Sequence, residues 1–198
     1  MLILLTLSTL CSCQFIIKQL MGISDPQIES VESLSAYMEK HSMPSEYLKT
    51  VKDSMSCTNL LNLGGAPDAY FFDSQKRYVE YRENKETCNG HVSVFIKNIP
   101  NNNNFNYNYD FDYYEIVNLM HHADTILADT SHYDFTIIMV WFKWMGKVDK
   151  LADWEKELNA LEKKEFRIRR IYLCGDYMNY MNISNPDDLG FDFKLGTN

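Results

Sequence analysis

The residues best suited to covalent chemistry in this 198-residue chain are its five cysteines. Cys57, Cys88 and Cys174 are far apart in the sequence, and no Cys-x-x-Cys pair or metal-type cysteine spacing occurs. Two interpretations are open: one pair forms a disulfide and leaves one thiol free, or all three are small buried side chains. Cys88 follows Thr87, a predicted helix N-cap, and the partial positive charge of a helix N-terminus favours a thiolate.

Histidines and carboxylates are weaker candidates for chemistry. His121 and His122 lie near acidic residues, but neighbouring residues of a helix point about 100° apart, so no metal site is predicted. Four carboxylates surround a predicted exposed hairpin, where solvation is their expected role: Asp73, Glu80, Glu83 and Glu86. The chain has no Gly-x-Ser-x-Gly, P-loop, His-Glu-x-x-His or Gly-rich dinucleotide motif. No catalytic residue and no cofactor is therefore predicted.

Composition and charge describe an acidic globular protein. A hydrophobic fraction of 45% favours one domain with a substantial core. The net charge of -8 argues against a nucleic-acid partner, because phosphate binding needs clustered cations. The densest cationic group is expected to form a solvated surface, with a local basic patch as the alternative: Lys163, Lys164, Arg167, Arg169 and Arg170.

The N-terminus resembles the signal sequence of bacterial lipoproteins. Residues 1–10 are apolar except for three hydroxyl side chains, and this run is too short to cross about 30 Å of hydrocarbon as a helix. The motif Leu10-Cys11-Ser12-Cys13 follows, with a small residue immediately before Cys13, as in the lipobox. The resemblance implies cleavage before Cys13, a thioether-linked lipid on its sulfur and acylation of the new amino terminus, which together give stable anchoring.

The same segment departs from the lipoprotein pattern because no basic residue precedes the apolar run. Cys11 is a second candidate for lipidation, but Leu10 is larger than the residues usual at the cleavage position. A buried N-terminal strand or helix is the alternative interpretation. The lipoprotein interpretation divides the chain into a signal peptide (1–12), a tether (13–25) and a single α/β domain (26–198).

Hydrophobic periodicity predicts alternating helices and strands in the domain. Helices are predicted over 26–41, 54–63, 87–99, 113–122 and 149–164, and strands over 47–52, 68–72, 77–81, 135–142 and 166–173. The continuous apolar run 135–142 is typical of a strand covered on both faces. The order strand, helix, strand from 135 to 173 predicts two parallel strands. The Asn-rich residues at about 100–112 are interpreted as a solvated loop, with glycan or partner binding as the alternative.

The segment that begins at Trp141 is similar to the active-site segment of thioredoxin-like proteins, in which a buried strand leads into Trp-x-x-Trp-Cys-Gly-x-Cys and a long helix. Trp141, Trp144 and Gly146 match this pattern. Met145 replaces the nucleophilic cysteine and Val148 replaces the resolving cysteine. Because a thioether does not ionise to a thiolate, thiol–disulfide exchange is not expected at this site.

Residues 47–99 resemble the other half of a thioredoxin-like fold, and Pro67 would correspond to the family's cis-proline. The hairpin half precedes the tryptophan motif along the chain, so the resemblance implies a permuted or rearranged three-layer sandwich. An unrelated three-layer α/β domain is the alternative.

These features predict a lipoprotein of the bacterial cell envelope, facing the periplasm or the cell surface. Its lipid contacts the membrane, and its domain binds a protein, peptide or glycan partner without catalysis. One alternative is a thiol redox enzyme that uses Cys88 with Cys57 or Cys174. Another is a structural or immunity-type lipoprotein with no ligand.

Overall fold

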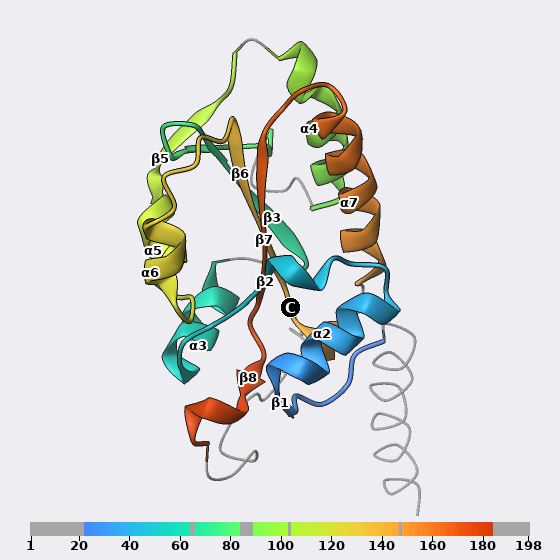
Figure 1. The fold of residues 1–198 in the computed structure, drawn as a ribbon, viewed down its shortest axis with the longest axis vertical. Coiled ribbons are helices and arrows are strands. Elements are labelled where there is room, and N and C mark those ends of the chain that lie inside the picture. The colour runs from blue at the N-terminus through green and yellow to red at the C-terminus, as the bar shows by residue number, and fades with distance from the viewer. Residues whose placement is uncertain (1–21, 64–65, 84–88, 103, 147, 184–198) are drawn as a thin grey trace, which may run out of the picture.

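In the computed structural model the chain forms an α/β domain around a mixed six-stranded sheet (Figure 1). The structure describes residues 22–63, 66–83, 89–102, 104–146 and 148–183. The sheet has the order β2 (Leu48–Thr50), β7 (Ile168–Cys174), β6 (Phe135–Trp141), β3 (Asp68–Asp73), β4 (Arg77–Val79) and β5 (Tyr107–Asp112). A separate parallel pair joins β1 (Ile28–Glu29) to β8 (Tyr177–Met178). The predicted signal peptide, Cys13, Glu86 and Cys88 lie outside the described residues.

The centre of the sheet is the strand–helix–strand unit expected from the sequence. β6 and β7 pair in parallel from Phe135↔Ile168 to Trp141↔Cys174, and α7 (Asp149–Glu162) connects them. All seven residues of β6 are buried, which explains their continuous apolar run. The prediction of two parallel strands is confirmed, and β2 adds a third strand parallel to β7.

The other half of the sheet is antiparallel. The predicted hairpin is present as β3 and β4, and β3 also pairs with β6. Residues 107–112 form β5 beside β4, so the prediction of a loop over this stretch is wrong. Aromatic residues at every second position of β5 are a strand pattern, which the asparagine-rich composition had obscured. The Phe111 ring stacks on Tyr70 of β3 with 4.9 Å between centroids.

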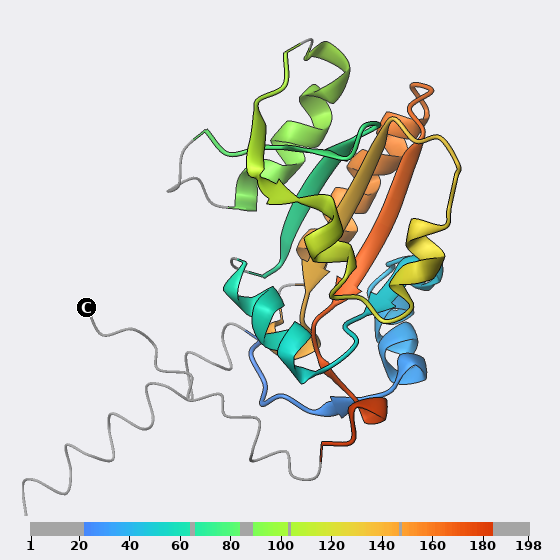
Figure 2. The same ribbon diagram turned by 90° about the vertical axis from the view of Figure 1, so that its left-hand side faces the viewer.

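Helices cover both faces of the sheet (Figure 2). α2 (Val31–Lys40), α4 (Val92–Asn98) and α7 pack on one face, in a core that we call the α7-side cluster. α3 (Ser54–Asn62), α5 (Tyr113–Val117) and α6 (Ala123–Leu127) pack on the other face, in the α3-side cluster. The predicted α/β class is confirmed, and helices on both faces agree with the predicted three-layer order. Short 3-10 helices are η1 (Ser45–Tyr47), η2 (Asn89–His91), η3 (Ile99–Asn101), η4 (Lys143–Met145) and η5 (Asn179–Met181).

Local capping explains where two of the helices begin. α3 begins as predicted, because the Asp53 carboxylate accepts a hydrogen bond from the Ser56 N–H at 2.7 Å. α2 begins at Val31 and not at Pro26, because the Ser30 hydroxyl accepts the Ser33 N–H at 3.1 Å and β1 occupies the preceding residues.

Candidate functional site

The turn between β6 and α7 contains the segment that resembles a thioredoxin-like active site. Trp141 and Trp144 are only 1% and 4% exposed. Met145 packs against the α3-side cluster, whereas Val148 is buried in the α7-side cluster. Gly146 between them has φ +62°, a backbone conformation that glycine adopts without strain. The two positions that would hold redox cysteines therefore pack on opposite faces of the sheet.

The buried carboxylate of Asp176, between β7 and β8, binds the backbone of this turn. The Lys143 N–H donates to Asp176 Oδ2 at 2.7 Å, and the Cys174 thiol donates to the same oxygen at 3.0 Å. Burial raises the pKa of Asp176 to about 6. The Lys143 ammonium pairs with Glu29 of β1 at 2.6 Å. These contacts hold the turn against the end of β7 and against the β1–β8 pair.

The two described cysteines from the proposed redox set are buried and do not form a pair. Cys57 belongs to the α3-side cluster and Cys174 to the α7-side cluster, and both are free thiols. Burial raises the pKa of Cys57 to about 12 and that of Cys174 well above its ordinary value. At neutral pH both therefore remain protonated, and a protonated thiol is a poor nucleophile.

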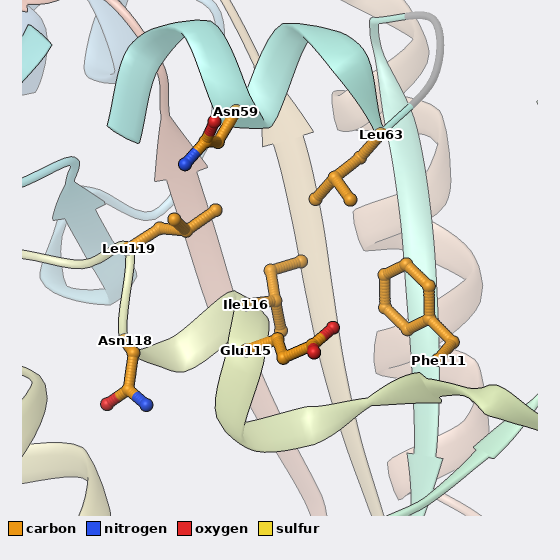
Figure 3. A pocket seen from close by; sticks show the side chains of 7 residues that line it. All are labelled: Asn59, Leu63, Phe111, Glu115, Ile116, Asn118 and Leu119. Atoms are coloured by element: carbon orange, nitrogen blue, oxygen red, sulfur yellow. The ribbon is translucent and has the colours of Figure 1, made fainter. Parts of the chain in front are cut away.

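A pocket of about 410 Å³ lies between α3 and α5 (Figure 3). Its lining residues are Asn59, Leu63, Phe111, Glu115, Ile116, Asn118 and Leu119. The apolar members occupy its centre: Leu63 extends from the end of α3 toward Ile116 of α5, and Phe111 of β5 closes one side (Figure 3). The volume lies within the range of sites that bind small molecules or single side chains.

Three polar side chains belong to the lining of this pocket. Within the described residues Glu115 makes no ion pair, and the side chains of Asn59 and Asn118 make no hydrogen bond. Glu115 extends toward Phe111, whereas Asn118 points away from the centre (Figure 3). An apolar centre with a few free polar groups is the usual composition of a binding site.

Three exposed apolar side chains lie on the two helices that contribute to the pocket. Met55 is 72% exposed and Leu63 is 39% exposed on the α3 side, and Tyr114 of α5 is 46% exposed. Sequence reasoning missed this site, because its residues come from separate segments. The only available signal was the apolar pair Met55 and Leu63 on the predicted helix.

The adjacent histidines lie in a turn and not on a helix. α5 ends at Val117, and His122 has φ +56° immediately before α6, so the predicted helix through 122 is too long. The His121 ring stacks on Tyr180 with 4.4 Å between centroids. In the part of the chain that the structure describes, no group of three or more His, Cys, Asp or Glu side chains could hold a metal ion.

One residue of the predicted solvated cationic group is buried. Arg170 is 8% exposed, and its guanidinium pairs with Glu155 at 2.8 Å and Glu162 at 2.6 Å, both on α7. The Tyr172 hydroxyl also donates to Glu155 at 2.6 Å. The sequence signal for this buried pair was Glu155, a carboxylate beside the apolar stripe of the helix predicted over 149–164. Arg169 is also paired, with Asp129 at 3.1 Å.

The hairpin carboxylates have structural roles. Asp73 pairs with Arg77 at 2.6 Å, and Glu80 lies 3.6 Å from the Arg82 guanidinium.

The peptide bond between Ala66 and Pro67 is cis. Asp68, the next residue, is buried and accepts the Tyr81 hydroxyl at 2.7 Å.

The fold and the site define an α/β domain with a closed turn after β6 and an open pocket between α3 and α5. Scans of family models, curated proteins and solved structures found no match to this chain. None of the described helices is both long enough and apolar enough to cross a membrane.

Proposed function

We propose that this protein is a lipid-anchored binding protein of the bacterial cell envelope, with Cys13 as the lipidated residue. Its domain binds a protein or peptide partner through the α3–α5 pocket and catalyses no reaction. The observation that supports binding is the pocket itself, with its apolar centre, free polar side chains and exposed apolar neighbours. The motif Leu10-Cys11-Ser12-Cys13 supports the anchor.

The domain in this proposal is a rearranged thioredoxin-like fold without redox activity. The β6–α7–β7 unit and the β3–β4 hairpin correspond to the two halves of such a fold, with the hairpin first along the chain. Met145 and Val148 at the redox positions support a binding role. The burial of Cys57 and Cys174 counts against the redox alternative, and Cys88 lies outside the described residues.

The pocket favours a partner that inserts an apolar side chain next to a cationic group. Burying one leucine-sized side chain contributes about 1.5–3 kcal/mol, so this contact alone gives weak binding. Met55 of α3 and Tyr114 of α5 are exposed on the same helices, and a partner larger than one side chain would contact them in this proposal. Glu115 is the one charged residue of the lining and would accept hydrogen bonds from lysine or arginine.

The binding experiment uses fluorescence anisotropy of defined peptides with the detergent-solubilised lipoprotein. We expect acetyl-Lys-Leu-Leu-Lys-amide to bind more tightly than its glutamate counterpart, and Glu115→Lys to reverse this preference. Leu63→Asp should weaken binding by about tenfold, the equivalent of one lost apolar contact. Val94→Asp is the matched control, because Val94 is 53% exposed on α4, across the sheet. Equal binding by Leu63→Asp and the native protein would refute the pocket as the binding site.

Two further measurements test the anchor and the lack of catalysis. Mass spectrometry of the N-terminal peptide should show diacylglycerol on Cys13, and Cys13→Ala should remove it. A predominantly intact, unacylated peptide spanning Ser12 and Cys13 in wild-type cells would contradict the anchor. Insulin-disulfide reduction well above that of a cysteine-free variant would contradict a non-catalytic role.

A further inference from the structure

The first described residues are bound to the turn after β6. The Ser24 N–H donates to the Trp144 carbonyl at 2.8 Å, and Ile23 packs against the α3-side cluster. Farther along, β1 pairs with β8, and Glu29 pairs with Lys143 of the turn. Residues 22–25 were expected to belong to the tether, but these contacts make them part of the domain. The tether therefore joins the domain at the carboxyl ends of β6 and β7.

This attachment point lies at one end of the molecule. β1, β8 and α2 lie together at the lower end in both views, whereas the loop between α7 and β7 lies at the upper end (Figures 1 and 2). We call these the β1–β8 end and the α7–β7 end. β6 and β7 run in parallel from the α7–β7 end to the β1–β8 end.

The tether is short compared with the domain. Eight residues separate Cys13 from Gly22, so even a fully extended chain places their Cα atoms no more than about 32 Å apart. A flexible chain of this length has a root-mean-square span of about 15–18 Å. A compact domain of this size has a radius of gyration of about 15 Å and is about 40 Å across. The tether is thus too short to pass along the domain and let its opposite end contact the membrane.

We infer that the β1–β8 end faces the lipid surface and that the α7–β7 end points away from it. This inference rests on the proposed lipid anchor at Cys13. Ile28 and Val31, which are 37% and 45% exposed, lie in and beside β1 and give this end an apolar surface. Asp25 and Glu32 lie in the same segment, so anionic headgroups would not attract it. The short tether therefore imposes the orientation, and no attraction to lipid charge contributes to it.

This orientation decides which surfaces of the domain a large partner can reach. The turn that contains Trp144 and Met145 lies on the membrane side, where a large partner would meet the bilayer. Surfaces toward the α7–β7 end remain open to the compartment. The β1–β8 end is thus a membrane-facing surface, and its partner is a bilayer.

The test uses the lipidated protein with a fluorophore on one introduced cysteine. Val31→Cys reports the β1–β8 end and Lys164→Cys the α7–β7 end, each in a Cys88→Ser background; Cys57 and Cys174 are buried. The protein is reconstituted into phosphatidylcholine vesicles that contain an acceptor dye on lipid headgroups. We expect energy transfer from position 31 to exceed that from position 164 by about twofold or more, as the size of the domain requires. Vesicles with anionic lipid should give the same ratio.

A lengthened tether is the matched control. Inserting 20 Gly and Ser residues between Met21 and Gly22 raises the root-mean-square span to about 30 Å and should remove the difference between the two positions. Equal transfer at both positions with the native tether would refute the orientation, and so would a difference that persists with the long tether. A protein without lipid on Cys13 would instead refute the anchor itself, which mass spectrometry of the same sample detects.

Discussion

The turn after β6 and the α3–α5 pocket both contain carboxylates, but they use them in different ways. Asp176 is 1% exposed and accepts hydrogen bonds from Lys143 and Cys174. Glu115 is exposed and makes no ion pair within the described residues. A buried polar group must be satisfied inside the protein, whereas an exposed one stays free for a ligand. The segment that resembles an active site is therefore closed, and the open pocket to which we assign binding lies elsewhere in the molecule.

The first prediction is that the thiols beside Asp176 react slowly. Cys57, with its pKa raised to about 12 by burial, should react with a disulfide reagent at pH 8 about a thousandfold more slowly than a free thiol. Cys174 is fully buried and should react no faster. Stopped-flow labelling of a Cys88→Ser variant, with and without urea, measures both rates. Rapid labelling in the native state would mean that the turn is open.

The second prediction is that Gly175→Ala destabilises the domain by about 3 kcal/mol, because it overpacks the closed region. A Cβ at Gly175 would overlap the Phe142 ring and lie 3.0 Å from Leu60 Cδ2. Urea denaturation measures the loss. Gly22→Ala is the comparison variant, since its Cβ would have its nearest neighbour at 3.9 Å and only the left-handed backbone at φ +67° opposes it. An unchanged urea midpoint for Gly175→Ala would show that the strand ends are loosely packed.

The predictable parts of the fold are elements whose own burial produces a regular hydrophobic pattern in the sequence. The apolar run of β6 and the stripe of α7 that includes Trp154 and Leu158 are examples. Burial on both faces produces the first pattern, and burial on one face produces the second. The pocket has no such pattern, because Leu63, Phe111 and Ile116 come together only when α3, β5 and α5 pack. The pocket also depends on β5, a stretch whose composition predicts a loop.

The tryptophan motif shows a different limit of sequence reasoning. Residue types predicted correctly that a buried strand leads into a turn and a long helix. They did not show that Ser24 binds the turn or that Asp176 supports it, because these contacts join segments far apart in the chain. Likewise, Arg170 was assigned to a solvated surface, since its partners Glu155 and Glu162 lie on the helix that precedes its strand.

The third prediction concerns the pH dependence that the buried Asp176 gives to stability. Its pKa of about 6 in the folded state exceeds the ordinary value of 3.8, so the folded state binds more protons than the unfolded state between these values. The contribution of Asp176 to stability is therefore greatest below pH 4, falls as pH rises through 6, and is constant above about pH 7. The total change is on the order of 3 kcal/mol.

Urea denaturation at a series of pH values, compared between the native protein and Asp176→Asn, isolates this contribution. The contribution of Asp68, whose pKa burial also raises, is common to both proteins. If Asp176→Asn and the native protein lost stability in parallel from pH 4 to pH 6, Asp176 would not be the buried acid that distinguishes the two regions.

The fourth prediction concerns Leu63 at the α3–α5 pocket. Leu63→Ala should change the free energy of unfolding by no more than about 0.5 kcal/mol, because Leu63 is 39% exposed at the end of α3. Leu60, one turn earlier on the same helix, is 1% exposed in the α3-side cluster, and Leu60→Ala should cost about 2–5 kcal/mol. The two variants remove the same atoms from neighbouring positions, so urea denaturation compares burial alone. A loss above about 2 kcal/mol for Leu63→Ala would mean that this leucine belongs to the core, and weaker peptide binding by Leu63→Asp could then reflect unfolding. A small loss leaves the side chain free to contact a partner.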